Sequence, residues 1–421
     1  SLVVSFVIVL TIIFLVYWRW SRRRLMRMAS ELGSGVLALP LVGHAYLFLG
    51  GGEGKYILII YTSKYLGGTT SYWLGTALFA TDPVVAEVVL KTCLEKDDVT
   101  ELTKTFIGNG SIFAPVSIWR RRRKVLLPNF GTKNLKHFVS IFAKQSGVMV
   151  EQLRASTGAG PITMWKYFTA YTIDSIAGED KDQTYTDGFA ICAERICKPW
   201  LHNDVIYSMM PVYKKLIDYR DYLWCFIQTK RKQLKEIDHH VLKTFLELLL
   251  EGRESVTDVE VREETMVIMM AGNDTSAVGA AFVTLMLSRH PEVQEKVYEE
   301  LYEVFGESTR AATMADLPRL RYLDAVVRET MRLYPPVPLI ARKVEKDIIL
   351  PSGVTLVPGS GVMVNIWALH RNPQYWGGDA EMFRPERFLD ADKHLAFMPF
   401  SHGPRNCLGD KFSYMTLLSR I

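Results

Sequence analysis

Near its carboxyl end the chain reads FSHGPRNCLG, from Phe400 to Gly409. Gly403 and Pro404 favour a turn before Cys407, and Gly409 lets the backbone approach closely after it. A sulfur held there can be surrounded by backbone N–H groups, and a helix that starts just after it also stabilises a thiolate. Such a thiolate is suited to bind haem iron as an axial ligand. The alternative is an inert buried thiol, the usual state of a cysteine.

Composition excludes several classes of protein. The chain has 421 residues, of which 48% are apolar and 23% charged, so it is not a disordered chain. Its length corresponds to roughly three domains of typical size. Five cysteines are too few for a secreted scaffold held by disulfides. Four of them lack the spacing of a zinc site, namely Cys93, Cys192, Cys197 and Cys225.

The amino-terminal segment, residues 1–18, contains no charged residue and reads SLVVSFVIVLTIIFLVYW. About 17–25 apolar residues span a bilayer as a helix. Tyr17, Trp18 and Trp20 lie at its end as an interfacial aromatic belt, and five arginines follow, which predicts an uncleaved anchor with the body on the cytosolic side. A cleaved signal peptide would instead carry its positive charge before the apolar run. The net charge of +5 equals these five arginines, and a body without net charge is a poor partner for nucleic acid.

The rest of the chain reads as helices with a minor sheet. We expect an anchor over residues 1–18, a basic and Pro/Gly-rich linker over 19–52 and one large domain over 53–421. Helices are expected at Pro291–Phe305 and Asp316–Leu333, where apolar residues recur at helical spacing. Short strands are expected within Thr69–Ala80 and Ile348–Asn365.

The segment Phe400–Gly409 resembles the haem-binding loop of the cytochrome P-450 monooxygenases. The match covers Phe400, Gly403, Arg405, Cys407 and Gly409. The resemblance implies the P-450 fold, with a single large helical haem domain, and Cys407 as the axial ligand of the haem iron. Phe400 belongs to the same cofactor-binding loop, and Arg405 can pair with a haem propionate.

Glu329 and Arg332 lie three residues apart, on one face of the helix that ends before Pro335. Taken alone, such a pair is a surface ion pair of little energetic value. The resemblance implies instead a buried triad with Arg387, which lies in FRPERF at 383–388.

The segment Ala271–Ser276 reads AGNDTS inside an apolar stretch. Helix propensity is poor here, so we expect a local distortion of the helix. The threonine hydroxyl can share the carbonyl four residues back, or simply contact a neighbour. The resemblance implies a long helix over the distal haem face, with Asp274 and Thr275 as the catalytic residues that deliver protons.

Trp119 and Arg123, in WRRRR, share one helical face. The resemblance implies that both bind haem propionates and that Arg342 is another propionate ligand. Arg120, Arg121, Arg122 and Lys124 are then expected to face elsewhere, as a solvated basic face or as a docking surface for an acidic electron donor. The resemblance also places residues near the substrate, namely Ala271, Val337, Leu339 and Ile340.

Several passages are most similar to insect members, particularly moth and butterfly ones, of the clan that contains the fatty-acid omega-hydroxylases. They include GNGSIF at 108–113 and NIWALHRNP at 365–373. Many omega-hydroxylases carry a glutamate, esterified to haem, where this chain has Ala271, so ester attachment is not expected. Only 14 residues follow Cys407. We therefore expect a truncated carboxyl end, and the region 158–189 is also short for the family.

The resemblance implies a haem-dependent monooxygenase that inserts one atom of O2 into a lipophilic substrate, either a fatty acyl, a hormone-like or a foreign compound. Electrons would come from NADPH through a cytochrome reductase, with cytochrome b5 as a second candidate donor, at the endoplasmic reticulum membrane. An alternative is a catalytically impaired or non-catalytic haem or ligand binder, because of the short carboxyl end. A haem-thiolate isomerase or dehydratase is a third class, and the Asp274–Thr275 pair argues against it.

Overall fold

The protein falls into two compact units in the computed structural model. The residues that the model describes are 2–32, 70–71, 77–158, 160–177, 191–192, 194–196, 198, 201–234, 245–251, 257–308, 310–389 and 395–418. The sheet unit comprises 1–97, 339–369 and 401–405, and the helical unit comprises 98–338, 370–400 and 406–421. The region 53–421, expected as one domain, thus contributes to both units.

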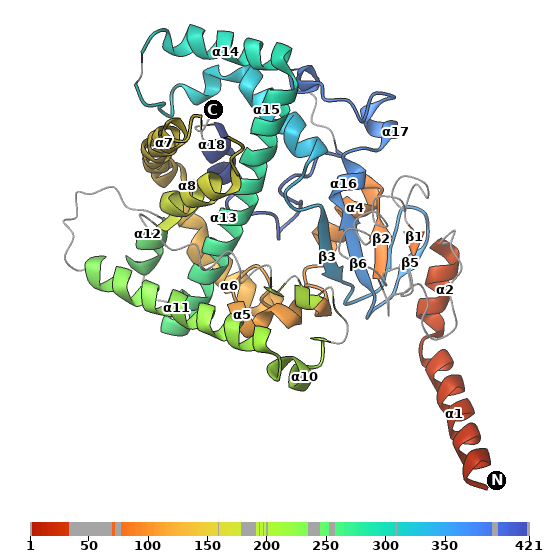
Figure 1. Cartoon of the computed structure of the whole chain (residues 1–421). Helices are drawn as coiled ribbons and strands as arrows, with labels where there is room; N and C mark the ends of the chain where they lie inside the picture. Colours follow the sequence, from red (N-terminus) through yellow and green to blue (C-terminus); the bar gives the residue numbers. More distant parts are fainter. Residues whose placement is uncertain are drawn as a thin grey trace. The chain divides into compact units, whose positions relative to one another are not determined.

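The sheet unit contains a four-stranded sheet in the order β1-β2-β6-β3 (Figure 1). β1 (Thr70–Ser71) pairs antiparallel with β2 (Ala77–Ala80), and β2 pairs parallel with β6 (Gly361–Asn365). β3 (Leu339–Lys343) completes the sheet antiparallel to β6, while β4 (Ile348–Ile349) and β5 (Thr355–Leu356) form a separate pair. The strands expected within Thr69–Ala80 and Ile348–Asn365 are therefore confirmed.

Among its described residues the sheet unit also contains helices, three early in the chain and a short one after β6. α1 (Leu2–Ser21) is an exposed apolar helix that is long enough to cross a membrane. α2 (Arg23–Leu32) falls in the expected linker and is an amphipathic helix that buries Leu25 and Met28. Residues 33–52 of the expected linker lie outside the described residues. α4 (Pro83–Thr92) begins with an Asp82 cap and a proline in its first turn, and α16 (Ile366–Leu369) follows β6.

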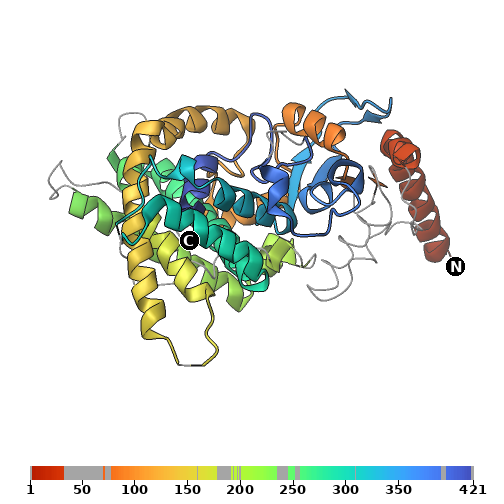
Figure 2. The same cartoon turned by 90° about the horizontal axis from the view of Figure 1, so that it is seen from above.

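The helical unit is built around α13 (Asp258–Arg289), a helix of 32 residues with a capping box at Thr257 and Glu260. α8 (Trp165–Ala177) packs along it, and α7 (Thr132–Ala155) packs on α8 (Figures 1 and 2). The other helices of the unit are α5 (Lys104–Ile107), α6 (Val116–Leu126), α10 (Asp204–Ser208), α11 (Pro211–Leu234), α12 (Phe245–Glu251), α14 (Pro291–Phe305), α15 (Arg321–Leu333), α17 (Pro373–Trp376) and α18 (Asp410–Leu418). Short 3-10 turns lie at Asp98–Thr103, Leu127–Phe130, Leu317–Arg319 and Pro385–Phe388.

The helix expected at Pro291–Phe305 is confirmed with the same bounds, and that expected at Asp316–Leu333 divides into a 3-10 turn and α15. The expected distortion at Ala271–Ser276 is wrong, because α13 runs through this segment without a break. Packing overrides the poor local propensity: Gly272 lets Ile176 of α8 approach so closely that a Cβ would lie 2.7 Å from its Cδ1 atom.

Candidate functional site

Cys407 lies in a tight loop of the helical unit. Its backbone N–H donates to the Phe400 carbonyl at 3.0 Å, and α18 starts three residues later. Burial raises the pKa of the Cys407 thiol to about 11, while a hydrogen bond from the Gly409 backbone and the charge of Arg123 act to lower this pKa. The Gly409 hydrogen bond thus lowers the pKa as expected of the loop, while burial has a larger effect in the opposite direction. A bound metal cation is the kind of group that reverses this balance.

Arg123 of α6 is held against the residue before the cysteine. Its Nη1 donates to the Asn406 carbonyl at 2.9 Å and its Nη2 to Asn406 Oδ1 at 2.6 Å. Its guanidinium carbon lies 6.0 Å from the ring centre of Trp119, which is buried. The structure thus brings Trp119, Arg123 and the Cys407 loop together, with Arg123 turned toward the loop backbone.

Three cations gather in the sheet unit. Arg342 is fully buried, its Nε makes no hydrogen bond, and no carboxylate among the described residues pairs with it. Burial lowers the pKa of Arg342 to about 10. Burial, followed by repulsion from Arg342 and Arg405, lowers the pKa of Lys96 well below its usual value. A buried guanidinium without a counter-ion fits a ligand that brings carboxylates, such as the propionates of haem.

The loop that carries Arg405 depends on a glycine. Gly403 has φ +75°, and a Cβ on it would overlap the backbone carbonyl of Leu90. Residues with a side chain rarely adopt this backbone conformation. Only glycine therefore allows the loop to lie against α4 in this way.

Glu329, Arg332 and Arg387 meet inside the helical unit. Glu329 accepts two hydrogen bonds from Arg332 at 2.7 Å and one from Arg387 Nε at 3.3 Å. Glu329 and Arg332 have no exposed surface. Arg332 also donates to the carbonyls of His370, Ala380 and Met382 at 2.6–3.0 Å. The cluster therefore ties α15 to the segment that precedes the cysteine loop.

His370 extends this cluster. Its Nε2 accepts from the Met398 backbone N–H at 2.9 Å, so the ring proton sits on Nδ1 and is donated to the Arg332 carbonyl at 3.1 Å. Burial lowers the pKa of His370 to about 3, which keeps the ring neutral. A neutral ring links Arg332 to Met398, two residues before Phe400.

Asp274 and Thr275 lie in the middle of α13. Burial raises the pKa of Asp274 to about 6, so its carboxyl exchanges a proton near neutral pH. The Thr275 hydroxyl donates to the Ala271 carbonyl at 2.7 Å, as its spacing allows. Asn273 accepts a hydrogen bond from Thr172 of α8, and its Nδ2 lies 3.4 Å from Asp274 Oδ1.

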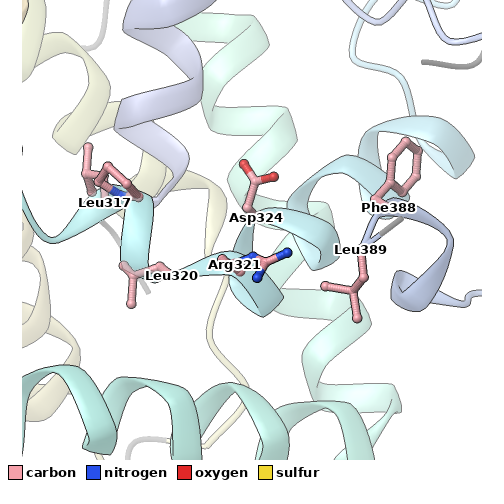
Figure 3. A pocket seen from close by; sticks show the side chains of 7 residues that line it. Leu317, Leu320, Arg321, Asp324, Phe388 and Leu389 are labelled. Carbon is pink, nitrogen blue, oxygen red and sulfur yellow. The ribbon is translucent and has the colours of Figure 1, made fainter. Parts of the chain in front are cut away.

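The residues expected near the substrate are dispersed. Ala271 is half-buried on α13, and Leu339 and Ile340 are half-buried on β3, whereas Val337 is 41% exposed. A cavity of about 250 Å³ lies elsewhere in the helical unit and is lined by Leu317, Pro318, Leu320, Arg321, Asp324, Phe388 and Leu389 (Figure 3). None of the expected site residues lines that cavity, so it gives no support to a substrate site there.

The sequence prediction did not include Lys96, Asn406 or His370. Asn406 and His370 adjoin recognised motifs, in PRNCLG and ALHRNP, which is the only signal that could have singled them out. Lys96 follows α4 in a charged segment with no distinguishing pattern.

A mainly helical fold and a half-buried cysteine in a turn before a helix fit a haem-thiolate protein, and the buried Arg342 and Arg405 of the sheet unit fit the carboxylates of its cofactor. The family model described as Cytochrome P450 matches residues 34–178 and 186–419. The chain is 32% identical to cytochrome P450 4V2 of Mus musculus, over 94% of this chain and 82% of that relative. It is 28% identical to cytochrome P450 4g15 of Drosophila melanogaster, over 96% of this chain and 88% of the relative. The chain is also 28% identical to cytochrome P450 4c21 of Blattella germanica, over 97% of this chain and 89% of the relative.

This chain belongs to the cytochrome P450 family. The family is one of haem-iron monooxygenases, which places the chain among the oxidoreductases. The insect relatives agree with the expected resemblance to insect members of the omega-hydroxylase clan.

Proposed function

We propose that this protein inserts one atom of O2 into a lipophilic substrate, a fatty acyl, hormone-like or foreign compound, with electrons from NADPH delivered by a cytochrome reductase or cytochrome b5. The single observation that supports this most is the half-buried Cys407 in a loop where its own N–H donates to the Phe400 carbonyl and the Gly409 backbone donates to the sulfur. Haem iron bound to a thiolate supplies oxygen activation, since the thiolate donates electron density that favours O–O cleavage.

The proposed roles of the binding residues follow from their charge and burial. Cys407 binds the iron, and Phe400 shields the sulfur from water. Arg342 and Arg405 bind the propionate carboxylates, and Lys96 adds a third cation on the same unit. In the helical unit, Trp119 and Arg123 of α6 are likewise proposed as propionate ligands, and Arg123 also donates to the carbonyl of Asn406.

Proton transfer is proposed for two residues of α13. Burial raises the pKa of the Asp274 carboxyl to about 6, so a minor fraction of it carries a proton at neutral pH and the group can take up and release a proton there. The Thr275 hydroxyl donates to the Ala271 carbonyl, which leaves its oxygen lone pairs free to accept a hydrogen bond from a proton-carrying group. Asp274 therefore supplies the proton, and the Thr275 hydroxyl oxygen accepts a hydrogen bond from the group that carries it and so orients that group.

The membrane is proposed as the source of the substrate. α1 is an apolar helix whose side chains are exposed, and arginines follow it, which favours insertion in the endoplasmic reticulum membrane with the rest of the chain on the cytosolic side.

Arg120 and Lys124 are exposed on α6 and form a candidate contact for an acidic electron donor.

The decisive experiment replaces the sulfur. Cys407→Ala should abolish the red-shifted Soret band of the reduced carbon monoxide complex and all NADPH-dependent oxidation of lipophilic substrates by reductase-supplemented protein. Cys192→Ala is the matched control, because Cys192 is also a buried thiol but lies in a separate apolar cluster. A Cys407→Ala protein that keeps this band and turnover would refute the proposal. Wild-type protein with the band but no turnover on any lipid would leave a haem-binding protein and refute the enzymatic role.

A further inference from the structure

Arg122 of α6 is buried among carboxylates of α13. Only 6% of this residue is exposed, and the side chains of Glu263 and Glu264 are similarly covered. Its Nη2 donates to Glu263 Oε2 at 2.7 Å and its Nη1 to Glu264 Oε1 at 3.0 Å. The expectation that Arg122 belongs to a solvated basic face or a docking surface is therefore wrong. A planar guanidinium that binds two carboxylates at once fixes both the distance and the rotation of α6 against α13.

The loop before α6 is held by the same carboxylates. Arg122 Nη1 donates to the Asn109 carbonyl at 2.5 Å, the Asn109 N–H donates to Glu263 Oε1 at 2.9 Å, and the Ser111 hydroxyl donates to Glu264 Oε2 at 2.6 Å. Gly108 has φ +59°, and a Cβ there would overlap the Glu263 carboxylate. The glycine thus permits the close approach of the loop, and each carboxylate oxygen of the pair has a donor.

The next residue of α6 points to the cysteine loop. Successive residues of a helix are rotated by about 100° about its axis, so Arg122 and Arg123 face different neighbours. Arg123 donates two hydrogen bonds to Asn406, at 2.6 and 2.9 Å. Two adjacent arginines therefore join α6 to α13 on one side and to the residue before Cys407 on the other. Both contacts lie within the helical unit.

We propose that Arg122 is a positioning residue of the haem-thiolate site: by binding Glu263 and Glu264 it holds α6 so that Arg123 keeps Asn406, and with it the Cys407 backbone, in place. This inference rests on the proposed function, because it takes Cys407 as the ligand of the iron. Loss of the two charge-assisted bonds leaves two buried carboxylates without their cation, which shifts or loosens α6. Arg123 then no longer holds Asn406, although Arg122 itself touches neither the sulfur nor the cofactor.

The test compares full-length Arg122→Met and Arg122→Lys with Arg195→Met. Arg195 is the matched control, since it is equally buried and bonded to Leu102, Leu201 and Asp204, and none of its bonds among the described residues goes to α6 or the cysteine loop. The readouts are the fraction of reduced carbon monoxide complex with the red-shifted thiolate band, and amide hydrogen exchange at Asn109 and Cys407. We expect Arg122→Met to lower the thiolate fraction at least about threefold and to raise exchange at both amides by roughly tenfold. Arg122→Lys keeps the positive charge but not the planar guanidinium that binds two carboxylates at once. Its thiolate fraction and exchange rates should lie between those of Arg122→Met and the wild type.

Arg195→Met, compared at equal loss of thermal stability, should keep the thiolate fraction of the wild type. The proposal is overturned if Arg122→Met and Arg195→Met lose the thiolate band equally, or if exchange at Cys407 is unchanged in Arg122→Met. If Arg122→Met does not fold, Arg122→Lys carries the same comparison, and an unchanged band there also overturns it. A wild-type protein without the thiolate band would instead refute the proposed function itself, which separates the two failures.

Discussion

Glu329→Gln tests how strongly the triad stabilises the helical unit. Glu329 Oε1 accepts from Arg332 Nη2 at 2.7 Å, the Arg384 N–H at 2.9 Å and Arg387 Nε at 3.3 Å, while Oε2 accepts from Arg332 Nε at 2.7 Å. An amide of the same shape turns an N–H2 group toward an arginine donor and removes the only negative charge among these contacts. Arg332 then loses its counter-ion, whereas Arg387 keeps its ion pair with Asp379 at 2.7 Å. Removing the partner of a buried charge typically costs about 3–5 kcal/mol.

The measurement is chemical and thermal unfolding of the full chain in detergent, followed by circular dichroism, with haem content read from the Soret absorbance. We expect Glu329→Gln to lower the free energy of unfolding by about 3–5 kcal/mol and to reduce haem incorporation. Arg154→Ala is the control, because Arg154 and Glu151 form an ion pair whose two side chains are each 72% exposed. This control should cost less than about 1 kcal/mol. A Glu329→Gln protein as stable as the control would show that the triad is dispensable.

Two further predictions concern α13 and the glycines. Burial raises the pKa of Asp274 to about 6 from its ordinary 3.8, so the ionised carboxylate disfavours the folded state and stability falls as the pH rises between these values. Asp274→Asn should therefore raise the free energy of unfolding by up to about 3 kcal/mol at about pH 8. At about pH 3, where the carboxyl is protonated in both states, the substitution should leave this free energy unchanged. Equal changes in the free energy of unfolding at both pH values would contradict this account. Gly110→Ala should lower the free energy of unfolding by about 1–3 kcal/mol, since a Cβ there would overlap Val267 of α13. Gly147 of α7 has open space around it, so Gly147→Ala should raise the free energy of unfolding by about 0.5–1 kcal/mol. Thermal melts of the two variants that shift in the same direction would contradict the packing argument.

The cysteine loop could be read from the sequence because its information is local, whereas the buried triad was implied only by the family resemblance. The turn residues around Cys407 and the spacing of Glu329 and Arg332 constrain the backbone within a few residues. The third partner, Arg387, came from the motif and not from spacing. Helix Pro291–Phe305 was predicted to the residue because its proline start, apolar stripe and glycine end all agree.

The fate of the four consecutive arginines of α6 could not be read in this way. Their helical spacing separates Arg122 from Arg123 but does not say which face packs, and that depends on Glu263 and Glu264, more than a hundred residues away. The continuity of α13 through AGNDTS was decided in the same manner, by the close approach of α8 at Gly272.

By itself, the sequence determined the class of protein, the iron ligand expected at Cys407 and the apolar segment that precedes the body, because each is written in residues close together in the chain. The tertiary structure alone decided in which direction the pKa values of the groups involved shift. A thiol, a carboxyl and a guanidinium acquire their shifted pKa values at Cys407, Asp274 and Arg342 through loss of water. Burial is a property of the packed fold and has no local signature in the sequence.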